Sequence, residues 1–288
     1  MSSDWISAVA RLRADRVPAV LVTVADVRGH APRAAGAKMV VSADRIWGSI
    51  GGGNLEAVAV ERARELVTGR TRQPVLFTAQ LSDKAPVEHG VQCCGGEVTV
   101  LLDPLPVAPA VAVFGVGHVG LELARILARH DLDLHLIDSR PEQLTDEVLA
   151  PLSDAVARIR AHHVPVLPEL VLAELPVGTH VLVMTHDHAE DAALVDAALR
   201  SDRPGSIGLI GSSAKWTRFR KKLLADGHTS ADLERVTTPI GLPELTGKEP
   251  ATIAVGIAAA LLLELERETA AAGGPGAVSV PLPREEAR

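Results

Sequence analysis

Two adjacent cysteines, Cys93 and Cys94, are the residues best suited to chemistry, and they stand in the glycine-containing segment Gln92-Cys93-Cys94-Gly95-Gly96. Thiolates are nucleophiles and ligands for soft metals, and oriented backbone N–H groups or His89 would favour the thiolate form. A single cysteine is more often a small buried hydrophobic residue, but two adjacent thiols in such a loop indicate a chemical role. They are the only two cysteines of the chain, which excludes a disulfide framework and a zinc site of four thiolates.

A glycine loop, Gly115-Val-Gly117-His118-Val-Gly120, directly follows the apolar run Val111–Phe114. In a dinucleotide-binding loop the first glycine permits the tight turn and the second lets the backbone approach a pyrophosphate. The third lets the helix and the strand pack closely. Because strand, glycine loop and helix follow in this order, the segment predicts a Rossmann-like unit.

An acidic residue, Asp138, ends the next apolar run, 18 residues after Gly120. In Rossmann-like folds this is the position of the acid that binds a ribose hydroxyl. Arg140 would accept a 2′-phosphate or pair with Asp138, and His118 would narrow the phosphate site. The loop therefore predicts binding of NAD(P) or another nucleotide; the alternative is a unit that keeps the fold and binds something else, or nothing.

Three consecutive glycines, Gly51, Gly52 and Gly53, lie between a predicted strand and a predicted helix that contains Glu56. Such glycines can expose several backbone N–H groups at a helix N-terminus, which favours an anion. The alternative is a turn in which Asn54 caps the helix. The segment lacks the Lys-Ser/Thr of a nucleotide P-loop, so it does not indicate NTP hydrolysis.

A polar cluster that contains His186, Asp187 and His188 follows the predicted strand His180–Met184. In α/β proteins the carboxyl ends of parallel strands carry the binding sites. With Asp191, the two histidines predict a metal site or a proton-transfer group. The alternative is a helix N-cap, supplied by Thr185 or Asp187.

Two cations, Lys215 and Arg218, follow another predicted strand. Residues three apart share a helix face, so the pair is a candidate for binding an anion. The alternative is a solvated basic face.

The chain divides into two halves near residues 103–110, where three prolines in eight residues suit an extended linker. The first half mixes helical and alternating patterns, which predicts an N-terminal mixed α+β domain over residues 1–104. Its predicted elements are helices at Trp5–Arg16 and Asn54–Thr68 and strands at Val20–Val27, Ala37–Val41, Arg45–Ile50, Val75–Ala79 and Val98–Leu102.

The second half, residues 105–270, alternates strands with helices, which predicts a Rossmann-like parallel sheet covered on both faces and the fold class α/β. Residues 271–288 are expected to be a disordered tail. The predicted strands are Ala110–Phe114, Leu134–Ile137, Val156–Ile159, His180–Met184 and Ser206–Ile210. The predicted helices are Val119–Arg129, Ala189–Ser201, Ala214–Ala225 and Pro250–Glu268.

Composition excludes several classes of protein. Of the 288 residues 47% are hydrophobic, the net charge is −7, and the aromatic residues are three Trp and three Phe. Negative charge and few aromatic rings argue against a nucleic-acid-binding protein. We expect a cytoplasmic protein that does not bind membranes, because the N-terminus lacks a signal-peptide pattern and the most apolar stretch, Ile253–Leu263, is about half a membrane span.

Taken together, these segments resemble the XdhC/CoxI family, the accessory proteins of xanthine dehydrogenase and related molybdenum hydroxylases. The resemblance runs in order over residues 20–265 and departs from the family pattern in Gly29-His30-Ala31-Pro32, where Ser or Thr is expected before the proline. The matching stretches are Gly48–Glu56, Gln92–Gly96, Phe114–Gly120, Met184–Asp191, Ile207–Arg218 and Pro239–Pro250.

The resemblance implies a cofactor chaperone more than a catalyst. Such proteins bind the molybdenum cofactor, a phosphorylated pterin dithiolene, and hold it while a cysteine desulfurase replaces a molybdenum oxygen by sulfur. They then deliver it to the apo-hydroxylase, and they are often homodimers. The candidate cofactor contacts are Gly51, Gly52, Gly53, Glu56, Gln92, Cys93, Cys94, Gly95, Gly115, Gly117, His118, Gly120, Asp138, Arg140, His186, Asp187, His188, Lys215 and Arg218, with Cys93 and Cys94 as metal ligands.

An NAD(P)-dependent oxidoreductase is the alternative function. In that case His186 or His188 would carry the proton, and the two cysteines would be a redox dithiol. A nucleotidyltransferase that modifies the same cofactor ranks lower, because the N-terminal half lacks a nucleotide loop with a following basic residue.

Overall fold

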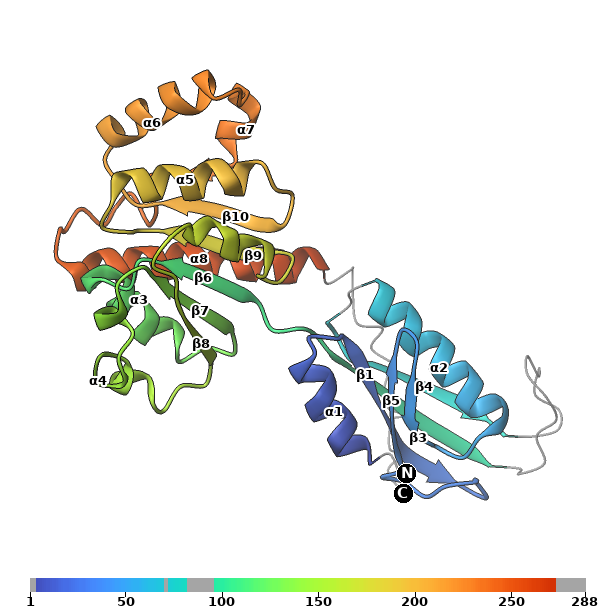
Figure 1. The fold of residues 1–288 in the computed structure, drawn as a ribbon. Helices are drawn as coiled ribbons and strands as arrows, with labels where there is room; N and C mark the ends of the chain where they lie inside the picture. Colours follow the sequence, from blue (N-terminus) through green and yellow to red (C-terminus); the bar gives the residue numbers. More distant parts are fainter. Residues whose placement is uncertain (1–3, 70–71, 82–95, 273–288) are drawn as a thin grey trace. The chain divides into compact units, whose positions relative to one another are not determined.

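The computed structural model describes residues 4–69, 72–81 and 96–272, which fall into two compact units (Figure 1). The first unit runs to Val107, and the second comprises Ala108–Glu266. The division between the units therefore lies after Val107, where the sequence predicted it after residue 104.

The first unit is an antiparallel sheet of order β3-β2-β1-β5-β4 with a helix on each face. Its strands are β1 (Ala19–Arg28), β2 (Lys38–Ser42), β3 (Ile46–Gly48), β4 (Val75–Gln80) and β5 (Glu97–Leu105), and its helices are α1 (Trp5–Ala14) and α2 (Gly53–Thr68). Alternation along β1 decides which helix covers which face. Val20, Val22 and Val24 lie in the core under α2, whereas Ala19 packs with Leu12 of α1.

The second unit is a parallel sheet of order β11-β10-β9-β6-β7-β8. The strands are β6 (Ala110–Phe114), β7 (Asp133–Asp138), β8 (Arg158–His163), β9 (Thr179–Val183), β10 (Pro204–Leu209) and β11 (Val236–Thr237). The helices are α3 (His118–Leu127), α4 (Asp146–Leu149), α5 (His188–Leu199), α6 (Ser213–Ala225), α7 (Ser230–Glu234) and α8 (Pro250–Ala272), with short 3₁₀ turns at Pro141–Gln143, Ala150–Leu152 and Pro168–Ala173.

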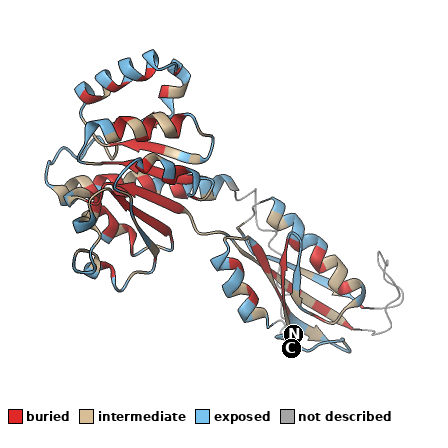
Figure 2. Ribbon diagram, in the orientation of Figure 1, coloured by how far each residue is buried: buried red, intermediate tan, exposed pale blue. Residues whose placement is uncertain are grey.

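Helices cover both faces of this sheet, which is why its central strands are apolar without interruption. In β6, Val111 and Val113 face a core shared with α3 and α8, whereas Ala112 and Phe114 face a core shared with α5. Every residue of β6 is buried (Figure 2). The predicted fold class, α/β with a mixed first domain and a Rossmann-like second domain, is confirmed.

Most element boundaries differ from the sequence prediction by one or two residues, and three of the differences are informative. The predicted strand Val156–Ile159 begins only at Arg158, because the N–H groups of Val156 and Ala157 bond to the Ala128 carbonyl after α3. The strand β5 continues through Pro104, which lies beyond the end of β4, so that only β1 pairs with it there. The last helix continues to Ala272, and residues 273–288, which carry most of the predicted tail, lie outside the described residues.

The order of the strands places a topological switch point between β6 and β9. From β6 the chain moves outward to β7 and β8, and β9 then pairs with β6 on its other side. In open α/β sheets, ligands bind at the carboxyl ends of the two strands that flank such a point. Within the described residues, no helix is long and apolar enough to span a lipid bilayer.

Candidate functional site

The glycine loop Gly115–Gly120 leaves β6 at the switch point, and its three glycines meet different surroundings. Gly115 has φ +101°, and a Cβ there would overlap the carbonyl of Met184 at the end of β9. A Cβ on Gly120 would overlap the carbonyl of Gly115. Gly117 is open, since the nearest atom to its would-be Cβ is Nη2 of Arg140 at 3.8 Å. Gly115 and Gly120 therefore allow the backbone to pack, and Gly117 faces the space in which a ligand would lie.

A cation and a helix N-terminus meet at this open position. The helix α3 begins at His118, its N-cap is Gly117, and no side chain caps it. The N–H groups of such a first turn and the helix dipole both favour an anion. The Arg140 guanidinium lies beside Gly117. Its Nε and one N–H of Nη2 bond to Asp138, and its other N–H groups are in position to donate to a phosphate.

Asp138, the predicted ribose-binding acid, is engaged by its own chain. One carboxylate oxygen accepts from the backbone N–H of Val116 at 2.7 Å and from Arg140 Nη2 at 2.9 Å. The other accepts from the backbone N–H of Arg140 at 3.0 Å and from Nε at 2.9 Å. Asp138 therefore ties β7 to the glycine loop, and this does not favour the NAD(P) alternative, which needs the carboxylate for a ribose.

The same contacts set the ionisation of Asp138. Burial raises its pKa, but the hydrogen bonds from Arg140 and Val116 outweigh burial and bring the pKa below its ordinary value. A carboxylate with a lowered folded-state pKa stabilises the fold fully above its unfolded pKa of about 3.9, and this contribution is lost as the pH falls through the lower folded value.

Asp138→Asn is therefore expected to lower the free energy of unfolding at pH 7 by about 2 kcal/mol, because the amide cannot accept all four hydrogen bonds. The difference from the parent should shrink as the pH falls toward 3. Urea unfolding at a series of pH values measures it. An equal difference at pH 7 and pH 3 would contradict the assignment.

The loop after β9 is held by a buried ion pair. Asp191 of α5 is fully buried and accepts from the backbone N–H of Thr185 at 3.0 Å and from its hydroxyl at 2.8 Å. Its other oxygen accepts from Lys215 Nζ at 2.5 Å, and that ammonium also donates to the Ile210 carbonyl at 2.9 Å. The pair thus ties together the carboxyl ends of β9 and β10.

The residues that the sequence analysis grouped after β9 have different roles in the structure. Asp187 is the N-cap of α5 and accepts from the N–H of Ala189, while His186 and His188 are exposed. Among the described residues, the two histidines and Asp191 do not form a group whose ligand atoms converge. Of the two predicted anion-binding cations, Lys215 is buried in its ion pair and Arg218 is exposed.

One residue at this edge was missed by the sequence analysis. Glu190 accepts a hydrogen bond from the Ser139 hydroxyl at 3.2 Å, next to Asp138. Burial raises the pKa of Glu190, and repulsion from Asp138 and Asp191 raises it further. Groups with perturbed pKa values gather at functional sites, so Glu190 is a candidate for proton transfer. Nothing in the local pattern distinguishes it from an ordinary helix-start glutamate.

In the first unit, the triple-glycine loop is folded around Glu56. Gly51, Gly52 and Gly53 have φ values of +127°, +73° and +64°. Oε2 of Glu56 accepts from the Ser49 hydroxyl at 2.6 Å and from the N–H groups of Ile50 at 3.1 Å and Gly52 at 3.0 Å. The carboxylate thus takes the place that an external anion would have at these two N–H groups. The predicted Asn54 cap is wrong, because the helix begins at Gly53 with Gly52 as N-cap and no side-chain cap.

The triple-glycine loop, the loop after β1 and Gly96 lie together at one end of this sheet. A Cβ on Gly51 would lie 2.6 Å from Cβ of Pro32, in the loop after β1. A Cβ on Gly96 would overlap the carbonyl of His30 in that same loop, and the N–H of Leu81 donates to the Gly96 carbonyl at 2.7 Å. Gln92, Cys93, Cys94 and Gly95 lie outside the described residues.

Fold and site define the class of the protein: a two-unit α/β protein whose parallel-sheet unit has a Rossmann-type loop. Comparison with family models identifies the family. The model described as the XdhC Rossmann domain matches residues 111–261, and the model of the XdhC and CoxI family matches residues 12–78. The chain belongs to the XdhC family.

Two curated proteins of Escherichia coli K12 are similar to this chain. The molybdenum cofactor insertion chaperone PaoD is 27% identical over 254 residues, which cover 78% of this chain and 76% of PaoD. The uncharacterized protein YqeB is 26% identical over 255 residues, which cover 88% of this chain and 44% of YqeB. The chain thus spans less than half the length of YqeB.

A solved structure, described as a xanthine dehydrogenase from Bacillus halodurans, matches with a TM-score of 0.46 and 19% identity. The match covers 96% of this chain and 98% of the other.

Proposed function

We propose that this protein binds the molybdenum cofactor, holds it for sulfuration and inserts it into xanthine dehydrogenase or a related molybdenum hydroxylase. The observation that carries the proposal is the similarity to the insertion chaperone PaoD over about three quarters of both chains. The protein acts as a cofactor-binding accessory protein, and its partners are an apo-hydroxylase, a cysteine desulfurase and a second copy of itself.

The parallel-sheet unit has donors that suit the cofactor's phosphate. Gly117 leaves room beside the backbone, the uncapped start of α3 offers N–H groups, and the Arg140 guanidinium lies next to both. We place the phosphate there, with the exposed Arg218 as a second candidate cation. The triple-glycine loop of the first unit stays a proposed contact, although two of its N–H groups are already bonded to Glu56.

The cofactor test uses protein purified from a host that makes the cofactor. After oxidation, the fluorescent pterin and the molybdenum that co-purify are measured. Arg140→Ala is expected to reduce pterin retention about 10- to 100-fold, the worth of a charged hydrogen bond, and Arg140→Lys should restore part of it. Arg125→Ala removes an exposed arginine of α3 and controls for the loss of a surface charge, and urea unfolding of Arg140→Ala separates lost binding from loss of the Asp138 ion pair. If the parent protein neither retains nor binds pterin, the proposed function fails.

The thiols are proposed to contact the molybdenum centre or to receive sulfur from the desulfurase. Cys93→Ser, Cys94→Ser and the double variant are therefore expected to lose delivery of active, sulfurated cofactor. The measurement is activation of apo-xanthine dehydrogenase in the presence of the desulfurase. Full activation by the double variant would remove the proposed role of the thiols and leave cofactor binding intact.

A further inference from the structure

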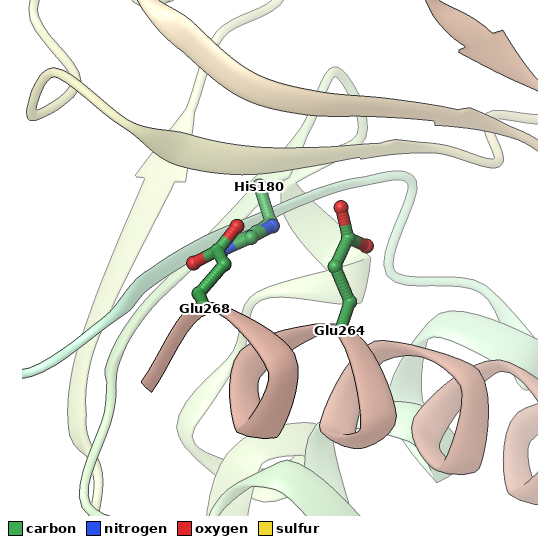
Figure 3. Close-up of side chains that lie close together, drawn as sticks. All are labelled: His180, Glu264 and Glu268. Atoms are coloured by element: carbon green, nitrogen blue, oxygen red, sulfur yellow. The ribbon is translucent and has the colours of Figure 1, made fainter. Parts of the chain in front are cut away.

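A histidine and two glutamates lie together at the amino end of the parallel sheet (Figure 3). His180 is the second residue of β9, whereas Glu264 and Glu268 are four residues apart on α8. One potential ligand atom from each residue lies within 4.8 Å of the other two. Thr185 is five residues further along the chain, about 16 Å away at the rise of a strand. The group is therefore separate from the loops at the carboxyl ends of the strands.

His180 is held as metal-ligating histidines usually are. It is 2% exposed, and its Nδ1 lies 2.9 Å from the Ser206 hydroxyl on β10. A partner on one ring nitrogen fixes the ring orientation and the tautomer, so that the other nitrogen can ligate. With Nδ1 held by Ser206, Nε2 is the nitrogen that would bind a cation.

The two glutamates come from one helix face. Residues at i and i+4 are neighbours on a helix, so the carboxylates of Glu264 and Glu268 lie close together despite their like charge. Figure 3 shows both side chains extending from α8 on the side where His180 lies. Glu264 is half-buried and Glu268 is exposed. Both carboxylates are therefore in position to ligate one cation together with His180.

We propose that His180, Glu264 and Glu268 bind a divalent first-row transition-metal ion, with Zn²⁺ as the best fit. One imidazole and two carboxylates suit Zn²⁺, Co²⁺ or Mn²⁺, whereas soft Cu(I) prefers thiolates and thioethers. Ligand atoms at 2.0–2.2 Å from a tetrahedral Zn²⁺ lie about 3.4 Å apart. The ligand atoms must therefore move roughly an ångström closer together, and rotation of the glutamate side chains allows this. The fourth position would hold water, and the ion would tie α8 to β9.

The competing arrangement has no metal: His180 and the two carboxylates interact only with one another and with neighbouring groups of the protein. The two arrangements differ in a titration with metal alone. The full-length protein carries Cys93→Ser and Cys94→Ser, because adjacent thiols would themselves bind Zn²⁺. After treatment with a chelator and removal of any affinity tag, Zn²⁺ is titrated by calorimetry and Co²⁺ by its visible absorption.

We expect one equivalent of Zn²⁺ to bind. Glu264→Gln and Glu268→Gln should each weaken binding at least about tenfold, and Ser206→Ala, which frees the ring of its partner, by about 10- to 100-fold. Glu266→Gln changes an exposed glutamate of the same helix outside the group and should leave the affinity unchanged. At the same Zn²⁺ concentration, the melting temperature of the parent protein should also rise more than that of the two glutamate variants.

The proposal is overturned if the parent protein binds Zn²⁺ no more tightly than about 1 mM, about −4 kcal/mol. It is equally overturned if Glu264→Gln and Glu268→Gln bind as the parent does. Glu264 is half-buried and Glu268 is exposed, and glutamine has nearly the same shape as glutamate. These variants therefore remove the charge without leaving a cavity in the core.

Discussion

Replacing Lys215 by methionine is expected to lower the free energy of unfolding of the second unit by about 3–5 kcal/mol. The side chains of Lys215 and Asp191 are 9% and 0% exposed. Removing the ammonium leaves the Asp191 carboxylate buried without its counter-charge, and this penalty is larger than the worth of an exposed ion pair. Urea unfolding at pH 7 measures the loss.

Two further variants make the Lys215 prediction specific. Lys221→Met removes an exposed lysine of the same helix and should change stability by no more than about 0.5 kcal/mol. The double variant Lys215→Met/Asp191→Leu should recover part of the lost stability, because it removes the unpaired buried charge, although Thr185 then loses its acceptor. Equal losses in Lys215→Met and Lys221→Met would show that the pair is not buried as described.

The consequence for function lies in the loop after β9. Asp191 holds the backbone and the hydroxyl of Thr185, and Thr185 lies against Gly115 at the switch point. A variant that loosens Asp191 should therefore also loosen the glycine loop. Hydrogen exchange of the Thr185 N–H measures this loosening. Unchanged exchange in Lys215→Met would show that the ion pair does not hold the loop in place.

The three glycines of the loop after β6 are expected to respond differently to alanine. Gly120→Ala and Gly115→Ala should each destabilise the second unit by about 3 kcal/mol or more, because the new Cβ would overlap a backbone carbonyl that cannot rotate away. At Gly115 the positive φ adds strain. Thermal and urea unfolding measure both losses.

Gly117→Ala should instead leave stability within about 1 kcal/mol, since its Cβ would meet only Arg140 Nη2 at 3.8 Å. It should weaken binding of the cofactor or of inorganic phosphate, because the methyl group enters the space beside the helix N-terminus. A Gly117→Ala protein that unfolds like Gly120→Ala, or binds ligand as the parent does, would refute this division of roles.

Much of the fold was predictable from local patterns. The uninterrupted apolar run of β6 predicts a strand covered on both faces, and its observed bounds, Ala110–Phe114, agree with the prediction. The alternation of strands and helices in the second half predicts a parallel sheet. The apolar runs and the alternation of strands and helices each involve many residues, so the predicted fold does not depend on any single residue. The beginning of β8 was misplaced because its position depends on bonds from Val156 and Ala157 to Ala128, far along the chain.

The sequence predicted which residues lie in the site loops, but it did not predict which groups they contact. The spacing of Lys215 and Arg218 predicts a shared helix face, yet the carboxylate that takes the Lys215 ammonium comes from α5, 24 residues earlier. Glu56 stands in a motif that suggests an anion site, and it bonds to two of that loop's own N–H groups. Asp138 stands where a ribose-binding acid is expected, and it accepts four hydrogen bonds from its own chain.

The adjacent thiols, the glycine loops and the order of strands and helices were determined by the sequence itself, because each depends on residues that are neighbours along the chain. Only the tertiary structure decided which charges are already compensated and which face a ligand. A carboxylate's role depends on the donors within about 3 Å of it, and those come from other elements. For the same reason His180 and Glu264, 84 residues apart, became a candidate metal site only when β9 and α8 brought them together.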